Sequence, residues 1–177
     1  MKITQFGQKY TINITEPQTF WTQFVHLCEN LKNGQNPTFG FFIYDDFNIF
    51  KELHNQDFNK HINNSKNVDD FHLFMMYARE RDNEIIDEVE VYKGALHFNV
   101  QPKVVLNILY EILNVLKIRT SNKNLLPLLI IFEIESGQVV KQKHVFYDSS
   151  VNASIIKNDF LSIFEDKTLI NWNKVVE

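Results

Sequence analysis

The chain has 177 residues and a formal net charge of −4, with 44% apolar residues and an aromatic share of 14%. A chain of this length can bury a sizeable core, and we predict a single globular domain over residues 1–177. The acidic balance argues against a general nucleic-acid binder, and the single cysteine excludes an intramolecular disulfide and a CxxC redox pair. We find no signal peptide and no apolar run long enough to cross a bilayer, so we expect a cytoplasmic protein without membrane contact.

Strand and helix patterns alternate in the first third of the chain. KYTINI alternates apolar and polar residues and predicts a strand, and Thr15 is placed to begin a helix that Gly34 ends. One face of this helix is apolar: Phe20, Phe24, Leu27, Cys28 and Leu31. A buried strand from Phe39 to Tyr44 and a helix from about Phe47 to Ile62 follow.

The middle of the chain predicts further strands. FHLFMMYA, from Phe71 to Ala78, has the length and aromatic content of a buried strand, although its methionines and alanine also suit a helix. We favour the strand. DEVEVYKGALHFNV alternates apolar and polar residues on both sides of Lys93-Gly94 and predicts a hairpin.

The last third predicts a helix, a hairpin and a closing helix. Pro102 opens a helix whose polar residues form one narrow stripe, and we expect most of its circumference to be buried. The stripe consists of Asn107, Glu111, Asn114 and Lys117. Pro127 precedes a hairpin that turns at Ser136-Gly137. The closing helix carries one apolar face: Ile156, Phe160, Ile163 and Phe164.

This order of elements predicts an α/β (or α+β) fold, a mixed β-sheet flanked by helices. It resembles a thioredoxin-type layout, in which a helix leads into a proline-preceded hairpin and a closing helix. The resemblance is one of element order alone. It implies that the active-site cysteines of that fold would lie where this chain has Asp45, Asp46 and Phe47, so that a thioredoxin-like domain here would be redox-inactive.

The paired aspartates Asp45 and Asp46 are the first candidate for chemistry. Adjacent carboxylates at the carboxyl end of a strand can hold a divalent cation or accept a proton. The alternative, which we favour, is that one of them caps the helix that follows. Phe47 stands where a DxD motif would need a second aspartate, and we predict no catalytic residue and no cofactor.

Histidine and cysteine residues provide weaker candidates. His54, Asp57 and His61 share one face of the predicted helix, but the two histidines are ~10 Å apart along its axis at ~1.5 Å per residue, too far to bind one metal ion. Cys28 belongs to an apolar helix face, and His26 points to a different face. We therefore expect a buried, inert thiol.

Acidic residues cluster in EIIDEVE, and a second acidic pair precedes FHLFMMYA. These residues are Glu84, Asp87, Glu88 and Glu90, together with Asp69 and Asp70. Such a surface can steer a basic partner protein, or it can simply be a solvated, charged strand edge. Nucleic-acid binding is least favoured, although Lys117, Arg119 and Lys123 form a small basic cluster.

These features lead to two main hypotheses about function, and a subunit of a larger assembly is a third possibility. A small, acidic, aromatic-rich domain without a catalytic motif has the character of a stoichiometric inhibitor. The first hypothesis is therefore a non-enzymatic protein-binding module, such as an immunity protein, an antitoxin or an adaptor, that binds a basic partner such as a toxin domain. The alternative is a redox-inactive thioredoxin-like domain, or a divalent-metal-dependent α/β enzyme that uses Asp45 and Asp46.

Overall fold

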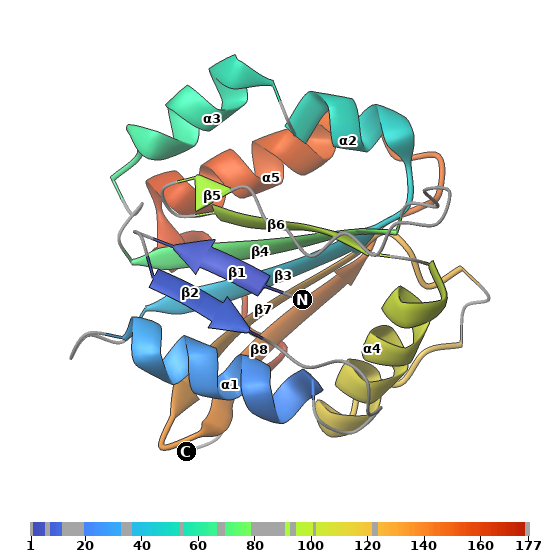
Figure 1. Ribbon diagram of the computed structural model, residues 1–177. Coiled ribbons are helices and arrows are strands. Elements are labelled where there is room, and N and C mark those ends of the chain that lie inside the picture. The colour runs from blue at the N-terminus through green and yellow to red at the C-terminus, as the bar shows by residue number, and fades with distance from the viewer. Residues whose placement is uncertain are drawn as a thin grey trace.

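Strands and helices alternate along the chain of the computed structural model (Figure 1). The structure describes residues 2–5, 8–11, 20–32, 37–53, 55–66, 70–78, 91–92, 95–100, 102–121 and 124–175. The strands are β1 (Lys2–Gln5), β2 (Gln8–Thr11), β3 (Thr38–Tyr44), β4 (Phe71–Ala78), β5 (Val91–Tyr92), β6 (Ala95–Val100), β7 (Leu128–Glu135), β8 (Gln138–Phe146) and β9 (Lys174–Val175). The helices are α1 (Phe20–Leu31), α2 (Phe47–Leu53), α3 (Gln56–Asn63), α4 (Pro102–Val115), α5 (Ala153–Glu165) and the 3-10 helix η1 (Lys167–Leu169).

Most of the strands form one mixed β-sheet in the order β5-β6-β4-β3-β7-β8-β9, and β1 and β2 form a separate hairpin. β3, β4 and β6 run parallel to one another, whereas all other neighbours in the sheet are antiparallel. Helices α1 and α4 cover one face of the sheet, and α2, α3 and α5 cover the other (Figure 1). This α/β arrangement confirms the predicted mixed sheet flanked by helices.

The central strand β3 is buried on both faces because helices cover both sides of the sheet. Its side chains alternate between the faces. Phe39, Phe41 and Ile43 enter the core beneath α1 and α4, and Phe42 and Tyr44 enter the core beneath α2, α3 and α5. A strand with two buried faces reads as a continuous apolar run, which is how FGFFIY appears in the sequence.

The outer side of α4 corrects the expectation that most of this helix is buried. Leu106, Tyr110 and Val115 are 43%, 59% and 44% exposed. The sheet covers α4 on one side only, and apolar residues on its outer side therefore remain in solvent (Figure 1). Glu111, from the predicted polar stripe, accepts a hydrogen bond from the backbone N–H of Trp21 at 2.9 Å. This carboxylate lies at the N-terminus of α1, where negative charge is favourable.

The predicted helix from Phe47 to Ile62 is wrong in one respect, because the segment forms two helices, α2 and α3. Asn55 begins the second one: its side-chain oxygen accepts a hydrogen bond from the backbone N–H of Asp57 at 2.8 Å. Asparagine competes for backbone hydrogen bonds in this way, which makes it a better helix start than a helix interior residue. The axial separation calculated for one continuous helix therefore does not apply to His54, which itself lies outside the described residues.

The predicted strand KYTINI is described only to Thr11, where β2 pairs with β1 outside the main sheet, and its last three residues lie outside the described part of the chain. Most other predicted elements are found where the sequence placed them. Phe71–Ala78 is a strand, both hairpins are present, and Ser136 and Gly137 turn the second one with φ angles of 50° and 78°. Helix α5 buries the predicted apolar face: Ile156, Phe160, Ile163 and Phe164. The helix limits predicted at Thr15 and Gly34 lie outside the described residues. None of the described helices is both long and apolar enough to span a membrane.

Candidate functional site

One edge of the sheet brings together segments that are distant in sequence. The parallel strands β3 and β4 end side by side, with Tyr44 opposite Tyr77, and β8 ends and β7 begins at the same edge. Ligands of open α/β sheets bind at the carboxyl ends of the strands. We call this region the carboxyl edge. Asp45 and Asp46 lie there, directly after β3.

Asp46 caps helix α2. Its Oδ1 atom accepts hydrogen bonds from the backbone N–H groups of Asn48 at 2.7 Å and of Ile49 at 3.1 Å. The first N–H groups of a helix have no partner within the helix, and a carboxylate at this position satisfies two of them. Asp45 is exposed. The favoured interpretation of the pair as a helix start therefore applies to Asp46.

We expect Asp46→Ala to lower the free energy of unfolding by about 1 kcal/mol, because the variant leaves two helix N–H groups without their acceptor. Asp46→Asn keeps a side-chain oxygen at the same place and should cost less. Asp45→Ala is the matched control, expected to change stability by less than about 0.5 kcal/mol. Urea unfolding measures all three. Equal losses at Asp45 and Asp46 would contradict the assignment of the cap to Asp46.

A polar hollow of about 440 Å³ opens beside Asp46, between α2 and the segment that leads into α5. Its lining is Asp46, Asn48, Ile49 and Glu52 from the α2 side, and Ser149, Ser150, Val151, Asn152, Ala153 and Ser154 from the α5 side. The Asn152 side chain caps α5 by accepting from the backbone N–H of Ser154 at 2.9 Å. Lys157 Nζ lies 3.1 Å from Glu52 Oε2 and joins α5 to α2. The hollow is therefore lined mainly by polar side chains, of which Asp46 and Glu52 are carboxylates.

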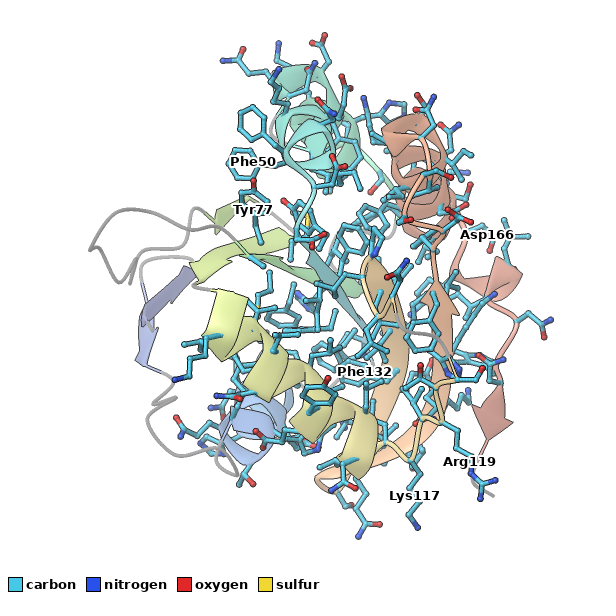
Figure 2. The ribbon with its side chains drawn as sticks, turned by 90° about the vertical axis from the view of Figure 1, so that its right-hand side faces the viewer. Phe50, Tyr77, Lys117, Arg119, Phe132 and Asp166 are labelled. Carbon is cyan, nitrogen blue, oxygen red and sulfur yellow. The ribbon has the colours of Figure 1, made fainter. Side chains whose placement is uncertain are left out.

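An aromatic ladder runs from the core to the surface at the same edge. It consists of Phe42, Tyr44, Tyr77, Phe50 and Phe47, with successive ring centroids 4.9, 5.1, 4.5 and 6.0 Å apart and the rings nearly parallel. Figure 2 shows Phe50 of α2 next to Tyr77 of β4. Phe42 and Tyr44 are fully buried, whereas Phe47 is 50% exposed. The ladder thus holds an exposed ring on a rigid stack.

The sequence analysis did not identify this ladder as a site. FNIF in α2 does contain the signal for its outer part, since Phe47 and Phe50 are three residues apart and fall on one helix face. Their contact with Tyr77 depends on the parallel pairing of β3 with β4, which brings a residue from a different element beneath α2. The local sequence of α2 therefore does not indicate this contact with Tyr77.

Two exposed carboxylates and one ammonium group lie at the edge where the ladder reaches the surface. Asp45 is exposed beside Phe47 in the chain, and Asp148 follows β8 at the same edge. The backbone N–H and the hydroxyl of Ser150 both donate to Asp148 Oδ1 and hold the pKa of this carboxyl below its ordinary value. The aspartate is therefore ionised at neutral pH. The Lys51 ammonium lies over the Phe47 ring, 5.2 Å from its centroid.

The acidic residues predicted as a partner-binding surface fall mainly outside the described part of the chain. These are Asp69, Glu84, Asp87, Glu88 and Glu90. Asp70 is described and half-buried, and its backbone carbonyl accepts a hydrogen bond from Thr38 N–H at 2.8 Å. Thr38 and Asp70 lie at the starts of β3 and β4, so the sheet separates Asp70 from Asp45 and Asp46 at the carboxyl edge.

The cysteine and histidine candidates remain apart from the carboxyl edge. Cys28 lies on the buried face of α1, and burial above all raises the pKa of its thiol well above the ordinary value. His26, Asp57 and His61 are exposed. Within the described residues, no three His, Cys, Asp or Glu side chains gather in a way that could hold a metal ion.

Two residues of the predicted basic cluster are described. Lys117 and Arg119 are exposed in the segment after α4, and Figure 2 shows both side chains pointing outward. Lys123 lies outside the described residues. The two described cations are on the opposite side of the ribbon from Phe50 and Tyr77 in this view (Figure 2).

No protein-family model, no curated protein and no solved structure matches this chain. The carboxyl edge, with its exposed ring, its carboxylates and its polar hollow, is the feature from which we infer function.

Proposed function

We propose that this protein is a non-catalytic binding domain that docks a basic partner protein on the carboxyl edge. The observation that carries the proposal is Phe47, a half-exposed aromatic ring held on a stack of rings and placed beside carboxylates. Large aromatic side chains of this kind are the usual energetic centres of protein interfaces. Phe47 would serve as the anchor of the interface.

The ladder supports an anchor role because it restricts the ring before binding. Phe47 stacks on Phe50, which stacks on Tyr77 at 4.5 Å, and Tyr77 in turn packs on buried Tyr44. A ring that is already ordered loses little conformational entropy when a partner covers it. Covering Phe47 also removes apolar surface from water at about 25 cal/mol per Å².

The charges of the edge indicate the chemistry of the partner. Asp45 and Asp148 are exposed carboxylates, and Asp46 and Glu52 line the adjoining hollow. Among the described residues, the cations at this edge are Lys157, which pairs with Glu52, and Lys51, which lies over the Phe47 ring. Asp45, Asp46 and Asp148 are therefore the carboxylates that would receive a basic group. Basic groups on a partner would be steered to this edge and would find hydrogen-bond acceptors there. The acidic run EIIDEVE follows β4 in the chain, and we propose that its carboxylates contribute to the attraction of the same basic partner.

A basic toxin domain is the kind of partner that fits, and the protein would then act as an immunity protein or antitoxin in the cytoplasm. An adaptor for another basic protein is the second form of the same proposal.

The thioredoxin-type layout is compatible with both an immunity protein and an adaptor. Helix α4 leads to Pro127, whose peptide bond with Leu126 is cis, then to the β7–β8 hairpin and α5. The cysteines of such a layout would lie where this chain has Asp45, Asp46 and Phe47, and we propose a redox-inactive domain.

Selection from a displayed library of short random peptides tests the proposal. We expect the protein to select peptides that combine Lys or Arg with an apolar residue, and to bind them more weakly as salt concentration rises. Phe47→Ala should weaken binding at least about tenfold. The matched control is Leu169→Ala, which removes another exposed apolar side chain, 66% exposed on η1. Selection of acidic or uncharged peptides, or equal binding by the Phe47 variant, would contradict the proposal.

A further inference from the structure

A second, smaller cavity lies on the flank of the sheet, between β7, β8, α5 and the segment around η1. Its volume is about 190 Å³. Lys143, Val145 and Tyr147 line it from β8 and the residue after it, Asp159 lines it from α5, and Ile170 closes one side. We call it the flank cavity.

The wall of the flank cavity is mostly apolar. Leu129 and Ile131 of β7 are 2% exposed, and Ile163 of α5 and Ile170 are 9% and 8% exposed. These branched side chains belong to the core beneath α5. A wall of this kind favours a ligand with an aliphatic or aromatic body.

Two residues of opposite charge line the same cavity from different elements. Lys143 comes from β8 and Asp159 from α5. Asp159 Oδ2 accepts a hydrogen bond from the Tyr147 hydroxyl at 2.6 Å, which fixes the carboxylate against the strand. Burial first, and then this bond and the Asp159 charge, raise the pKa of the Tyr147 hydroxyl, which therefore remains a donor at neutral pH.

Lys143 differs from the other lysine on its side of β8. Lys141 Nζ pairs with Glu133 Oε2 at 3.1 Å and lies over the Trp172 ring, 5.7 Å from its centroid. Lys143 forms no salt bridge with any described carboxylate, Asp159 included. The cavity therefore presents a cation and an anion that do not neutralise each other directly.

We propose that the flank cavity binds a small zwitterion with an apolar body, which is the chemistry of a free apolar α-amino acid such as leucine. The ligand carboxylate would pair with Lys143, its ammonium group with Asp159, and its side chain would lie on Leu129, Ile131 and Ile163. A simple anion would face Asp159 and a simple cation would face Lys143, whereas a zwitterion satisfies both charges. The volume, below the ~300–1,000 Å³ of pockets for drug-sized ligands, suits a molecule of this size.

The flank cavity shares no lining residue with the polar hollow, and neither proposal depends on the other. The probes are leucine, 4-methylpentanoate, which lacks the ammonium group, and 3-methylbutylamine, which lacks the carboxylate. Thermal unfolding and calorimetry of the full chain measure their binding. We expect leucine to raise the melting temperature in a saturable way, and each analogue to bind at least tenfold more weakly. No stabilisation by leucine, or equal stabilisation by either analogue, overturns the proposal.

Variants locate the binding site within the protein. Lys143→Met and Asp159→Asn should each weaken leucine binding at least tenfold; the asparagine retains an acceptor for the Tyr147 hydroxyl and so preserves the local packing. Lys103→Met, which removes an exposed lysine from α4, is the control and should bind leucine as the unaltered chain does. Cooperative unfolding without ligand shows that each variant is folded. Undiminished leucine binding by both folded cavity variants would place the site elsewhere and overturn the assignment.

Discussion

Replacing Phe24 by alanine should lower the free energy of unfolding by about 3–5 kcal/mol, the largest effect expected from any single change described here. Phe24 lies on the buried face of α1, and its ring is fully buried in the core between α1 and the sheet. It contacts five described rings, with centroid distances from 4.7 to 6.0 Å: Phe20, Trp21, Phe41, Phe74 and Phe132. The variant removes this buried apolar surface and leaves a cavity that a close-packed core fills only in part.

Urea unfolding measures the loss, and Phe24→Leu is the control. Leucine restores most of the volume, so this variant should retain much of the lost stability, although it loses the edge-to-face ring contacts. If the alanine variant loses less than about 1 kcal/mol, Phe24 does not occupy the centre of a rigid core.

Gly40→Ala should lower the free energy of unfolding by about 1–3 kcal/mol, although alanine in a strand is ordinarily more stable than glycine. A Cβ atom at Gly40 would lie 2.8 Å from Phe71 Cζ and 3.0 Å from Leu73 Cδ1. Phe71 has little room to move, because it is fully buried and packs edge-to-face against Phe164 at 4.8 Å. The glycine is required here by the close approach of its neighbours.

A second substitution distinguishes this cause from a general weakness of the strand. Phe71→Leu shortens the side chain that meets the added Cβ, so in its presence Gly40→Ala should cost much less. A double-mutant cycle in urea gives the coupling between the two positions. Additive losses would mean that Phe71 is not the obstacle, and a gain in stability from Gly40→Ala alone would contradict the close contact itself.

Periodicity predicted most elements correctly, because burial on a sheet or under a helix imposes a repeat on the chain. The apolar runs at Phe39 and Phe71 became the paired central strands, and the single apolar face of α5 became its buried face. The turn at Ser136-Gly137 was predictable since glycine readily takes the positive φ that such a turn needs. In each case the physical constraint acts within a few residues.

The errors arose where a neighbouring element or a competing local interaction decided the outcome. The helical spacing of apolar residues continues past Asn55. The Asn55 side chain nevertheless accepts a hydrogen bond from a backbone N–H group, and a new helix begins there. For α4, the apolar residues Leu106 and Tyr110 suggested burial, but no described element covers their side of the helix. The number of apolar residues in a helix indicates how much of its surface is favourable to bury. It does not show whether another element is present to cover that surface.

The candidate site was also predictable only in part. That an aspartate would cap α2 follows from the sequence, because capping joins a side chain to backbone groups two and three residues away. The ladder that presents Phe47 could not be predicted, because Tyr44 and Tyr77 meet only through the parallel register of β3 and β4. The flank cavity similarly requires β8 and α5 to face each other.

The amino-acid order of this protein thus indicated most of its secondary structure, the buried face of α5 and the cap of α2, because periodicity and capping act over a few neighbouring residues. The pairing of β3 with β4 and β7 then assembled the carboxyl edge and the flank of the sheet from residues that are tens of positions apart. Which ring is exposed, and which charges share a cavity, follow from that packing, because exposure and proximity are properties of several elements together.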